Sequence, residues 1–159
     1  MTAGGRFSTG TGESRDARKG AGMSGLISAV PVLVALDVPR TKSFWVDVLG
    51  FEEDFEVEDF AGISRDDVEI FICSVDDQLV PDNTQAWVRC ANLDSLHAEW
   101  AAHLSLDYSD VSGPAMTQIR EVPWGREFGL RDPGGNLVHF MDALDDHDAT
   151  DGDQAHVVG

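Results

Sequence analysis

The chain has 159 residues, of which 42% are hydrophobic, and that is enough for one domain of ordinary size with a buried core. Its 29 Asp and Glu exceed its 11 Lys and Arg to give a formal net charge of −18, which repels phosphate groups and favours cationic ligands, so we expect no nucleic-acid partner. No apolar run reaches the roughly 18 residues of a membrane span, so we expect no membrane association either.

Cysteine usage and the N-terminal composition bear on where the protein works. Cys73 and Cys90 both fall in apolar, strand-like runs without metal-binding spacing. The N-terminus has no apolar segment of the kind found in secretory signals. Together these features favour a reduced, cytoplasmic protein.

The two ends of the chain differ in composition from its middle. Residues 1–25 are rich in Gly, Ser and Thr with almost nothing to bury, so we expect a disordered N-terminal extension. Residues 142–159 carry many Asp and no Lys or Arg, which predicts an acidic, disordered tail. Residues 26–141 are predicted to form a single domain of two modules, 26–80 and 81–141.

The first module is predicted to run strand, helix and three further strands. A strand over 29–36 leads to a helix that opens at Asp37-Val38-Pro39, because Pro fits the first helical turn. Apolar residues then recur at helical spacing as far as Gly50, which is placed to end the helix. The three strands are expected over 51–57, 60–65 and 68–75.

The second module is predicted to repeat this plan. A strand over 85–90 precedes a helix whose N-terminus either Asn92 or Asp94 could cap. The remaining strands are expected over 119–122, 126–131 and 137–141. Each half then runs β-α-β-β-β in an α+β fold, and the two βαβββ modules should pair because neither can bury both faces of its sheet alone.

A hairpin is the clearest local signal near the end of the domain. Pro133-Gly134-Gly135-Asn136 supplies a fixed φ and then tolerance of positive φ between two runs of alternating apolar residues. The strand after this turn contains His139. A lone His in such a strand is more often hydrogen-bonded within the sheet than a metal ligand or a base.

Two sets of phrases carry a family resemblance. The run from Phe44 to Phe51 and the run from Arg131 to Asn136 resemble the vicinal oxygen chelate superfamily, which includes glyoxalase I, extradiol dioxygenases and fosfomycin-resistance enzymes. Further phrases, in order and at consistent spacing, resemble the bleomycin-binding resistance proteins of that superfamily. They lie at 29–33, 59–62, 65–68, 80–84, 112–117 and 123–128.

The resemblance implies a particular assembly. It implies cup-shaped mixed sheets, a homodimer with two ligand clefts between its subunits, and a first strand, carrying Pro31, that is exchanged between protomers. The residue type is consistent with this, because Pro31 has no N–H to donate to a sheet and belongs at an edge, a bulge or a crossing point.

Metal chemistry is the main alternative function. The superfamily's metal-ligand positions correspond here to Val30, Glu69, Gln85 and His139. Val30 has no donor atom and Gln85 is a poor ligand for a catalytic divalent ion, so at most two credible ligands remain where about three are needed. We therefore expect no metal site and no catalytic residue. A metal-dependent glyoxalase, dioxygenase or thiol transferase that uses His139 and Glu69 stays open as the alternative.

Aromatic residues near predicted turns mark the expected binding site. By the resemblance, Phe55, Phe60, Trp87 and Trp124 line an apolar cleft that holds the flat bithiazole of the drug. Trp124 and Phe60 lie beside turns, where a ring has few neighbours, whereas Trp87 could equally belong to the core. The set of expected ligand-binding residues is Phe55, Phe60, Trp87, Trp124, Asp54, Asp82 and Gly135.

Acidic residues are expected to complement a cationic ligand. Asp54, Glu56, Glu58, Asp59 and Asp82 crowd the same predicted loops, and bleomycins carry a cationic tail. We therefore expect a non-enzymatic protein that sequesters bleomycin-type glycopeptides, two per homodimer, with no cofactor and no metal except one carried by the drug. A binder of some other flat cationic molecule is the second alternative.

Overall fold

The computed structural model describes residues 24–144. The disorder predicted for residues 1–23 and 145–159 lies outside this range. Within it, the final strand continues to Asp142, one residue into the segment predicted to be a tail. No helix of residues 24–144 combines the length and the apolar character needed to cross a membrane.

The first module forms a four-stranded sheet in the order β1-β4-β3-β2, with β1 parallel to β4 and the other pairs antiparallel. Helix α2 (Val38–Asp47) lies against one face of this sheet. Its N-cap Asp37 accepts a hydrogen bond from the Arg40 backbone at 3.1 Å, and the chain leaves the helix through Gly50 with φ of +78°. The strands are β1 (Val32–Ala35), β2 (Glu52–Val57), β3 (Phe60–Arg65) and β4 (Val68–Ser74).

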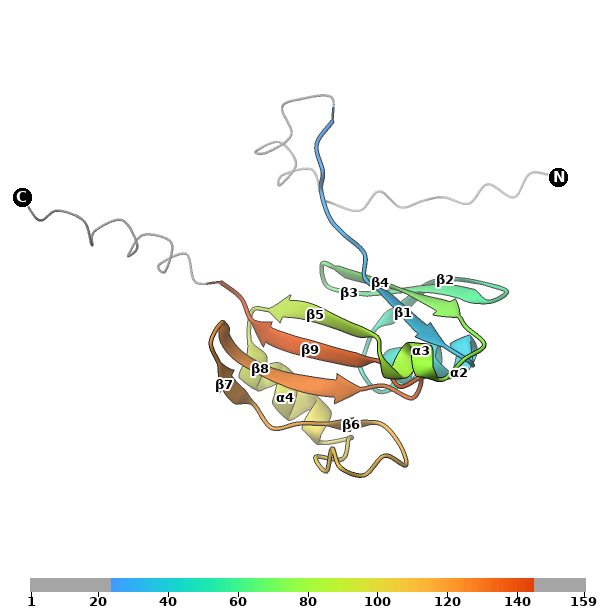
Figure 1. The fold of residues 1–159 in the computed structure, drawn as a ribbon. Helices are drawn as coiled ribbons and strands as arrows, with labels where there is room; N and C mark the ends of the chain where they lie inside the picture. Colours follow the sequence, from blue (N-terminus) through green and yellow to red (C-terminus); the bar gives the residue numbers. More distant parts are fainter. Residues whose placement is uncertain (1–23, 145–159) are drawn as a thin grey trace, which may run out of the picture.

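The second module forms a five-stranded sheet in the order β5-β9-β8-β6, with β7 paired to β8 (Figure 1). Helix α4 (Leu93–Ala101) begins at Asn92, whose side chain accepts from the Ser95 backbone at 3.1 Å. Of the two predicted caps, Asn92 is therefore the one used. The strands are β5 (Gln85–Cys90), β6 (Ala115–Met116), β7 (Arg120–Val122), β8 (Gly125–Arg131) and β9 (Leu137–Asp142).

Two details differ from the prediction. The first strand is shorter than 29–36 and begins at Val32, because Pro31 has no N–H to donate and contributes only its carbonyl, which accepts from the Phe71 backbone. A four-residue helix, α3 (Leu79–Asp82), occupies a segment predicted as a loop, and it is too short to show helical periodicity. Cys73 and Cys90 are free, and both are partly rather than fully buried.

The segment before β1 leaves the body of the molecule as an extended arm (Figure 1). Residues 24–31 have no regular secondary structure. Leu26 and Ile27 within this arm are both strongly exposed. An arm with two large apolar side chains in solvent is a surface that gains free energy when it is covered.

The two modules share one hydrophobic core and are joined by buried polar contacts. Trp45 of α2 donates from Nε1 to Asp132 Oδ2 at 3.0 Å, and burial raises the pKa of Asp132. Trp100 of α4 donates from its Nε1 to the Leu49 carbonyl at 3.2 Å. The pairing predicted for the two halves therefore occurs within one chain.

The predicted turn at 133–136 is confirmed and also touches the first module. Asn136 accepts from the Val34 backbone N–H at 3.1 Å and donates to the Val34 carbonyl at 2.9 Å, although the two residues are 102 positions apart. Gly135 has φ of +108°, which explains a glycine there. The turn thus fixes the edge strand β1 against the second module.

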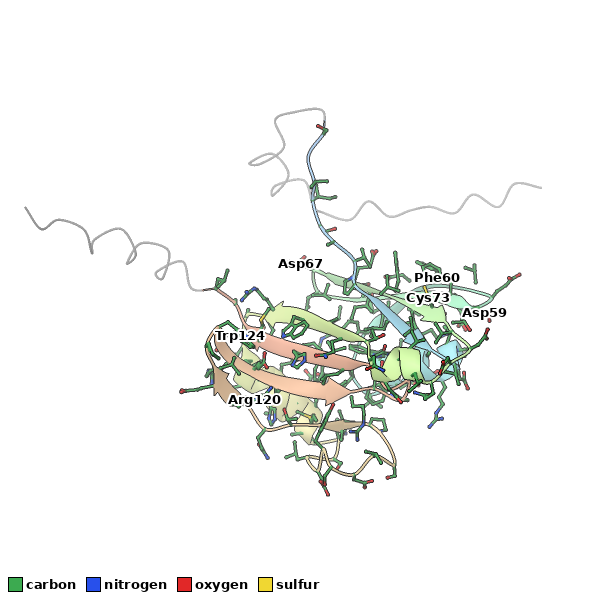
Figure 2. All side chains as sticks on the ribbon, viewed as in Figure 1. Asp59, Phe60, Asp67, Cys73, Arg120 and Trp124 are labelled. Atoms are coloured by element: carbon green, nitrogen blue, oxygen red, sulfur yellow. The ribbon has the colours of Figure 1, made fainter. Side chains whose placement is uncertain are left out.

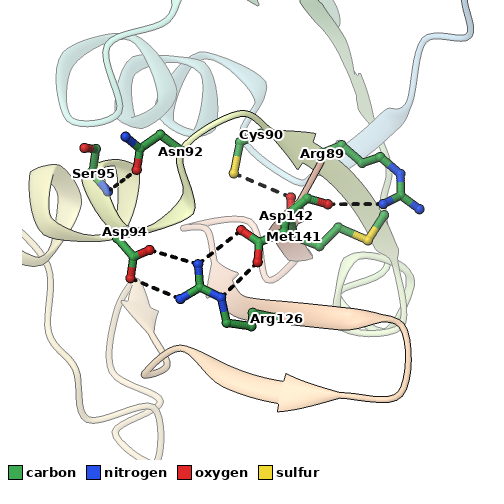
Figure 3. A network of polar contacts seen from close by, with 8 residues as sticks. All are labelled: Arg89, Cys90, Asn92, Asp94, Ser95, Arg126, Met141 and Asp142. Atoms are coloured by element: carbon green, nitrogen blue, oxygen red, sulfur yellow. Dashed lines mark hydrogen bonds and ion pairs between the residues drawn. The ribbon is translucent and has the colours of Figure 1, made fainter. Parts of the chain in front are cut away.

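An arginine fastens the end of the second sheet to its helix. Arg126 of β8 makes two hydrogen bonds to Asp94 of α4, at 3.2 and 2.9 Å, and donates from Nε to Asp142 of β9 at 2.9 Å (Figure 3). All three side chains are partly exposed to solvent, so these ion pairs connect β8, β9 and α4 but contribute little to the free energy of unfolding.

Candidate ligand-binding site

Each sheet has one face covered by its helix and one face without a helix. On the first sheet, Ala61, Ile63, Ile70 and Ile72 are buried on the helix side. Because side chains alternate along a strand, Phe60 and Phe71 point to the other side. Phe55 of β2 pairs in register with Gly62 and joins them. We name Phe55, Phe60 and Phe71 the phenylalanine face.

The phenylalanine face is a compact cluster. Its ring centroids lie 5.4 Å apart for Phe55 and Phe60, 5.8 Å for Phe55 and Phe71, and 5.1 Å for Phe60 and Phe71. The Phe55 ring covers Gly62 so closely that a Cβ at Gly62 would lie 2.7 Å from the ring's Cζ atom. Phe55 is 36% exposed, so the cluster is open to a ligand.

Acidic residues lie beside this face, both within strand β2 and in the turn that follows it. Asp54 is within strand β2 rather than in a loop, at an irregularity of the β2–β3 pairing, and it accepts from the Ser64 hydroxyl at 2.8 Å. Lys42 of α2 binds two neighbouring carboxylates, Glu53 at 2.9 Å and Glu56. Every residue of β2 is exposed.

On the second sheet, Trp87 and His139 lie on the face away from α4. They are register partners of β5 and β9, and their rings stack with centroids 4.4 Å apart and planes inclined by 7°. Trp87 is 48% exposed in the single chain, so the alternative that it belongs to the core is wrong. His139 is hydrogen-bonded within the sheet as expected, because its Nε2 lies 3.0 Å from Gln85 Oε1.

Trp124 lies in the turn between β7 and β8 and is 56% exposed. Its Nε1 donates to Glu127 Oε2 at 3.0 Å, and Arg120 donates to Glu127 Oε1 at 3.2 Å. Glu127 itself is only 1% exposed. We name Trp87, Trp124, Glu127 and His139 the indole face. Figure 2 places Trp124 and Arg120 at the same end of the second sheet.

The charge state of the indole face follows from these contacts. Burial alone would raise the pKa of Glu127, but the hydrogen bonds from Trp124 and Arg120 and the nearby His139 lower it overall. Burial lowers the pKa of His139, so at neutral pH an ionised carboxylate lies beside a neutral imidazole. The contact between His139 Nε2 and the Gln85 carboxamide is compatible with either neutral tautomer, because that carboxamide carries both an accepting oxygen and a donating NH2 group.

The second ring nitrogen of His139 is left without a hydrogen bond. Its Nδ1 is buried and has no hydrogen-bond partner among residues 24–144, although Glu127 Oε1 lies 3.5 Å away. A hydrogen on this nitrogen would point toward the Glu127 carboxylate. Protonation of the whole ring would pair the imidazolium with that carboxylate.

Asp82 and Gly135 lie together at the turn beside α3. Gln78 donates to Asp82 at 2.9 Å and to the Gly134 carbonyl at 2.8 Å, and a Cβ at Gly135 would overlap the Asp82 carboxylate. They line a cavity of about 580 Å³ that contains no residue of either aromatic face. A second cavity of about 460 Å³, between Arg65 and α4, contains none of the predicted site residues.

The single chain therefore brings the predicted residues together in three groups. Phe55, Phe60 and Asp54 lie on the first sheet, Trp87 and Trp124 on the second, and Asp82 and Gly135 at the turn beside α3. Sequence reasoning missed Phe71, Glu127 and Arg120. The alternation of β4 carried a signal for the first, because a residue between Ile70 and Ile72 must point away from the core.

The residues at the superfamily's metal-ligand positions do not fit a metal ion in this chain. Val30 has no donor atom, and Glu69 is on the first sheet, in register with Ser64, while Gln85 and His139 on the second sheet bind each other. Within residues 24–144 no group of three or more His, Cys, Asp or Glu side chains is arranged to hold a metal ion.

Comparisons with known proteins point to one protein family. A family model described as the glyoxalase/bleomycin resistance protein/dioxygenase superfamily matches residues 28–140. Among solved structures, the bleomycin-binding protein of the bleomycin producer Streptomyces verticillus, complexed with copper(II)-bleomycin, is 53% identical. That match covers 77% of this chain and all of the other, with a TM-score of 0.75. No curated protein sequence matches the chain.

Two more distant structures share the fold. A bleomycin-binding protein complexed with bleomycin is 20% identical, with a TM-score of 0.67 over 75% of this chain and all of the other. A bleomycin resistance determinant encoded on the transposon Tn5 is 21% identical, with a TM-score of 0.65 over 74% of this chain and 98% of the other. The chain therefore belongs to the glyoxalase/bleomycin resistance protein/dioxygenase superfamily.

Proposed function

We propose that this protein binds bleomycin-type glycopeptide antibiotics and sequesters them in a stoichiometric complex, without catalysing a reaction. The observation that carries the proposal is the 53% identity, over 77% of the chain, to a protein whose structure holds copper(II)-bleomycin. The two exposed aromatic faces support it, because each offers rings to a flat heteroaromatic group.

The energetics of such a site are adequate. Each ring that stacks on a flat heteroaromatic contributes roughly 0.5–1.5 kcal/mol beyond its buried area. The exposed acidic strand β2 beside Phe55 adds attraction for a cationic tail, which acts mainly on the rate of association because it is screened by solvent. In this proposal Phe55, Phe60, Trp87 and Trp124 stack, and Asp54 contributes charge.

The site requires a second copy of the chain. Neither of the two cavities described above includes a ring of either aromatic face, and the two faces lie on different sheets. We therefore place the phenylalanine face of one protomer opposite the indole face of its partner. By two-fold symmetry a dimer has two such clefts and holds two drug molecules. The exposed Leu26 and Ile27 support an arm, ending at Pro31, that is exchanged between protomers.

A metal ion in the complex would arrive with the drug. The donor set of this chain does not fit a resident ion, as Val30 and the Gln85–His139 hydrogen bond illustrate. In this arrangement the carboxylate of Asp82, beside Gly135, contacts the outer part of the ligand. The protein acts in the cytoplasm, where it keeps the drug from DNA.

Tryptophan fluorescence tests the proposal directly. Titration with bleomycin and with copper(II)-bleomycin should quench the emission at submicromolar concentration, with one drug per protomer in a species of dimer mass. A DNA-cleavage assay should show protection that stops abruptly at one equivalent of protein. Unchanged fluorescence at tens of micromolar drug would remove the ligand assignment, and protection by substoichiometric protein would show turnover.

A further inference from the structure

Glu127 is a buried carboxylate at the centre of the indole face. It is on β8, with β7 on one side and β9 on the other. Its two oxygens face different groups: Oε2 accepts from Trp124, while Oε1 accepts from Arg120 and lies 3.5 Å from His139 Nδ1. A carboxylate that is 1% exposed is costly unless such partners surround it, so the arrangement is specific.

The contact with Glu127 decides where the Trp124 ring lies. Trp124 is more than half exposed, so packing alone cannot fix its orientation. The hydrogen bond from its Nε1 to Glu127 is the one polar contact of that ring among residues 24–144. A hydrogen bond to an ionised acceptor is stronger than a neutral one, and it therefore restrains an otherwise mobile surface ring.

The second indole is linked to the same carboxylate through an imidazole. Trp87 stacks on His139 with nearly parallel planes, so the plane of His139 sets the plane of Trp87. That imidazole is held between Gln85, which binds Nε2, and Glu127, which faces Nδ1. Displacement of the Glu127 carboxylate or loss of its charge would therefore be transmitted to Trp87.

We propose that Glu127 is a positioning residue for ligand binding, whose single carboxylate orients Trp124 directly and Trp87 through His139. Its ligand-binding consequence rests on the proposed function, but the coupling of the two rings can be observed in the free protein. The two tryptophans then act as one unit, and a change at either ring alters the other.

The free protein provides the first test. All four tryptophans, Trp45, Trp87, Trp100 and Trp124, give indole N–H resonances in a ¹⁵N–¹H spectrum, and single Trp→Phe variants assign them. In Glu127→Gln the resonances of Trp124 and Trp87 should both shift, while those of the buried Trp45 and Trp100 stay in place. The matched control is Glu121→Gln, an exposed position on the neighbouring strand, which should move none of the four.

A second variant keeps the test decisive if the buried substitution does not fold. Trp124→Phe changes an exposed ring and leaves Glu127 without its indole donor. The indole resonance of Trp87 should shift. The pKa of His139 should rise, because the Glu127 carboxylate keeps its charge but no longer accepts a hydrogen bond from Trp124. The charged groups that act on His139 within residues 24–144 are Glu127 and Arg120. An unchanged Trp87 resonance and unchanged His139 titration would overturn the coupling.

The drug separates this inference from the proposed function. Where the wild type binds copper(II)-bleomycin, Glu127→Gln should weaken binding by about ten-fold or more, as expected for loss of a charge-assisted hydrogen bond, and Glu121→Gln by less than about two-fold. If the wild type does not bind but the resonances shift as described, the ligand assignment fails and the positioning role stands. Tight binding with unshifted resonances in Glu127→Gln would overturn the positioning role alone.

Discussion

The phenylalanine face and the indole face occupy equivalent places in the two modules, yet they hold their rings by different forces. Phe55 is positioned by contact with two other rings and by the absence of a side chain at Gly62. Trp124 and Trp87 are positioned by a buried carboxylate and an imidazole. The first arrangement depends on shape alone, whereas the second depends on ionisation, so the two halves of one cleft should respond differently to mutation and to pH.

The largest effect is expected from a side chain placed under Phe55. In Gly62→Ala the new Cβ overlaps the Phe55 ring, which must swing away from its two neighbours. We expect drug binding to weaken by about 2–3 kcal/mol and unfolding to become easier by about 1–3 kcal/mol, the cost of overpacking. Calorimetric titration and chemical denaturation measure the two effects.

A matched glycine on the other sheet is the control for that substitution. Gly129 lies in register with His139, and a Cβ there would crowd the end of the Leu137 side chain at 3.1 Å and meet Thr117 at an ordinary contact distance of 3.8 Å. Gly129→Ala should therefore cost less than about 1 kcal/mol in either measurement. Equal losses for the two variants would contradict the idea that shape positions only the phenylalanine face.

The next effect concerns an exposed ring. Trp124→Ala should weaken drug binding by about 1–3 kcal/mol, as for a binding anchor, because it removes a stacking surface. Stability should also fall, by about 1–3 kcal/mol, because the buried Glu127 carboxylate loses one of its hydrogen-bond donors. Val111→Ala, at another strongly exposed apolar position, should change neither quantity. Unchanged drug binding in Trp124→Ala would assign the ring a purely structural role instead.

Acidification should affect the indole face and leave the phenylalanine face intact. The folded pKa of His139 lies below its unfolded value of about 6.5, mainly because of burial and despite the opposing charge of Glu127. The unfolded chain thus binds more protons than the folded chain. The contribution of neutral His139 to the free energy of unfolding is therefore fully present above about pH 6.5 and falls as the pH drops toward the folded pKa. Denaturation between pH 7.5 and 5 should show this slope.

His139→Asn removes the titrating imidazole, so the loss of stability between pH 7.5 and 5 that it causes should disappear. A wild-type slope that persists unchanged in His139→Asn would assign the titration to another group. Gly62→Ala should keep the wild-type slope, because the Phe55 ring packs against Phe60 and Phe71, which do not titrate.

The smallest effect is expected at the acidic rim of the phenylalanine face. Lys42 binds Glu53 and Glu56, and Lys42→Gln should reduce stability by about 0.2–1 kcal/mol, as for a surface ion pair. The difference from wild type should shrink in high salt. The variant also leaves β2 more negative, so association with a cationic drug should be faster at low salt in stopped-flow measurements. A slower association would exclude steering by this strand.

Local signals in the sequence predicted most of the fold. Asp37 and Asn92 cap helices as expected, and the turn at 133–136 forms where Pro and Gly predict it. These features depend on neighbours within a few positions, which a sequence displays directly. The short helix α3 has too few residues to show periodicity, and the late start of β1 depends on how Pro31 meets β4.

The candidate site was only partly predictable for a related reason. Aromatic residues beside turns could be recognised one by one, but the pairing of Trp87 with His139 joins positions 52 residues apart. Glu127 looked like any other acidic residue, because only the register of β7, β8 and β9 shows that it is buried between polar partners. Burial of a charge is a property of the sheet, and a single sequence does not display it.

The contact between Asn136 and β1 has a consequence for the behaviour of the exposed arm. β1 is an edge strand, and the N–H and C=O of Val34 point away from its neighbour β4, where an unrelated strand could attach. The carboxamide of Asn136 fills both positions and imitates one residue of an adjoining strand. Unwanted aggregation along this edge is thereby discouraged, even though Leu26 and Ile27 remain uncovered a few residues away.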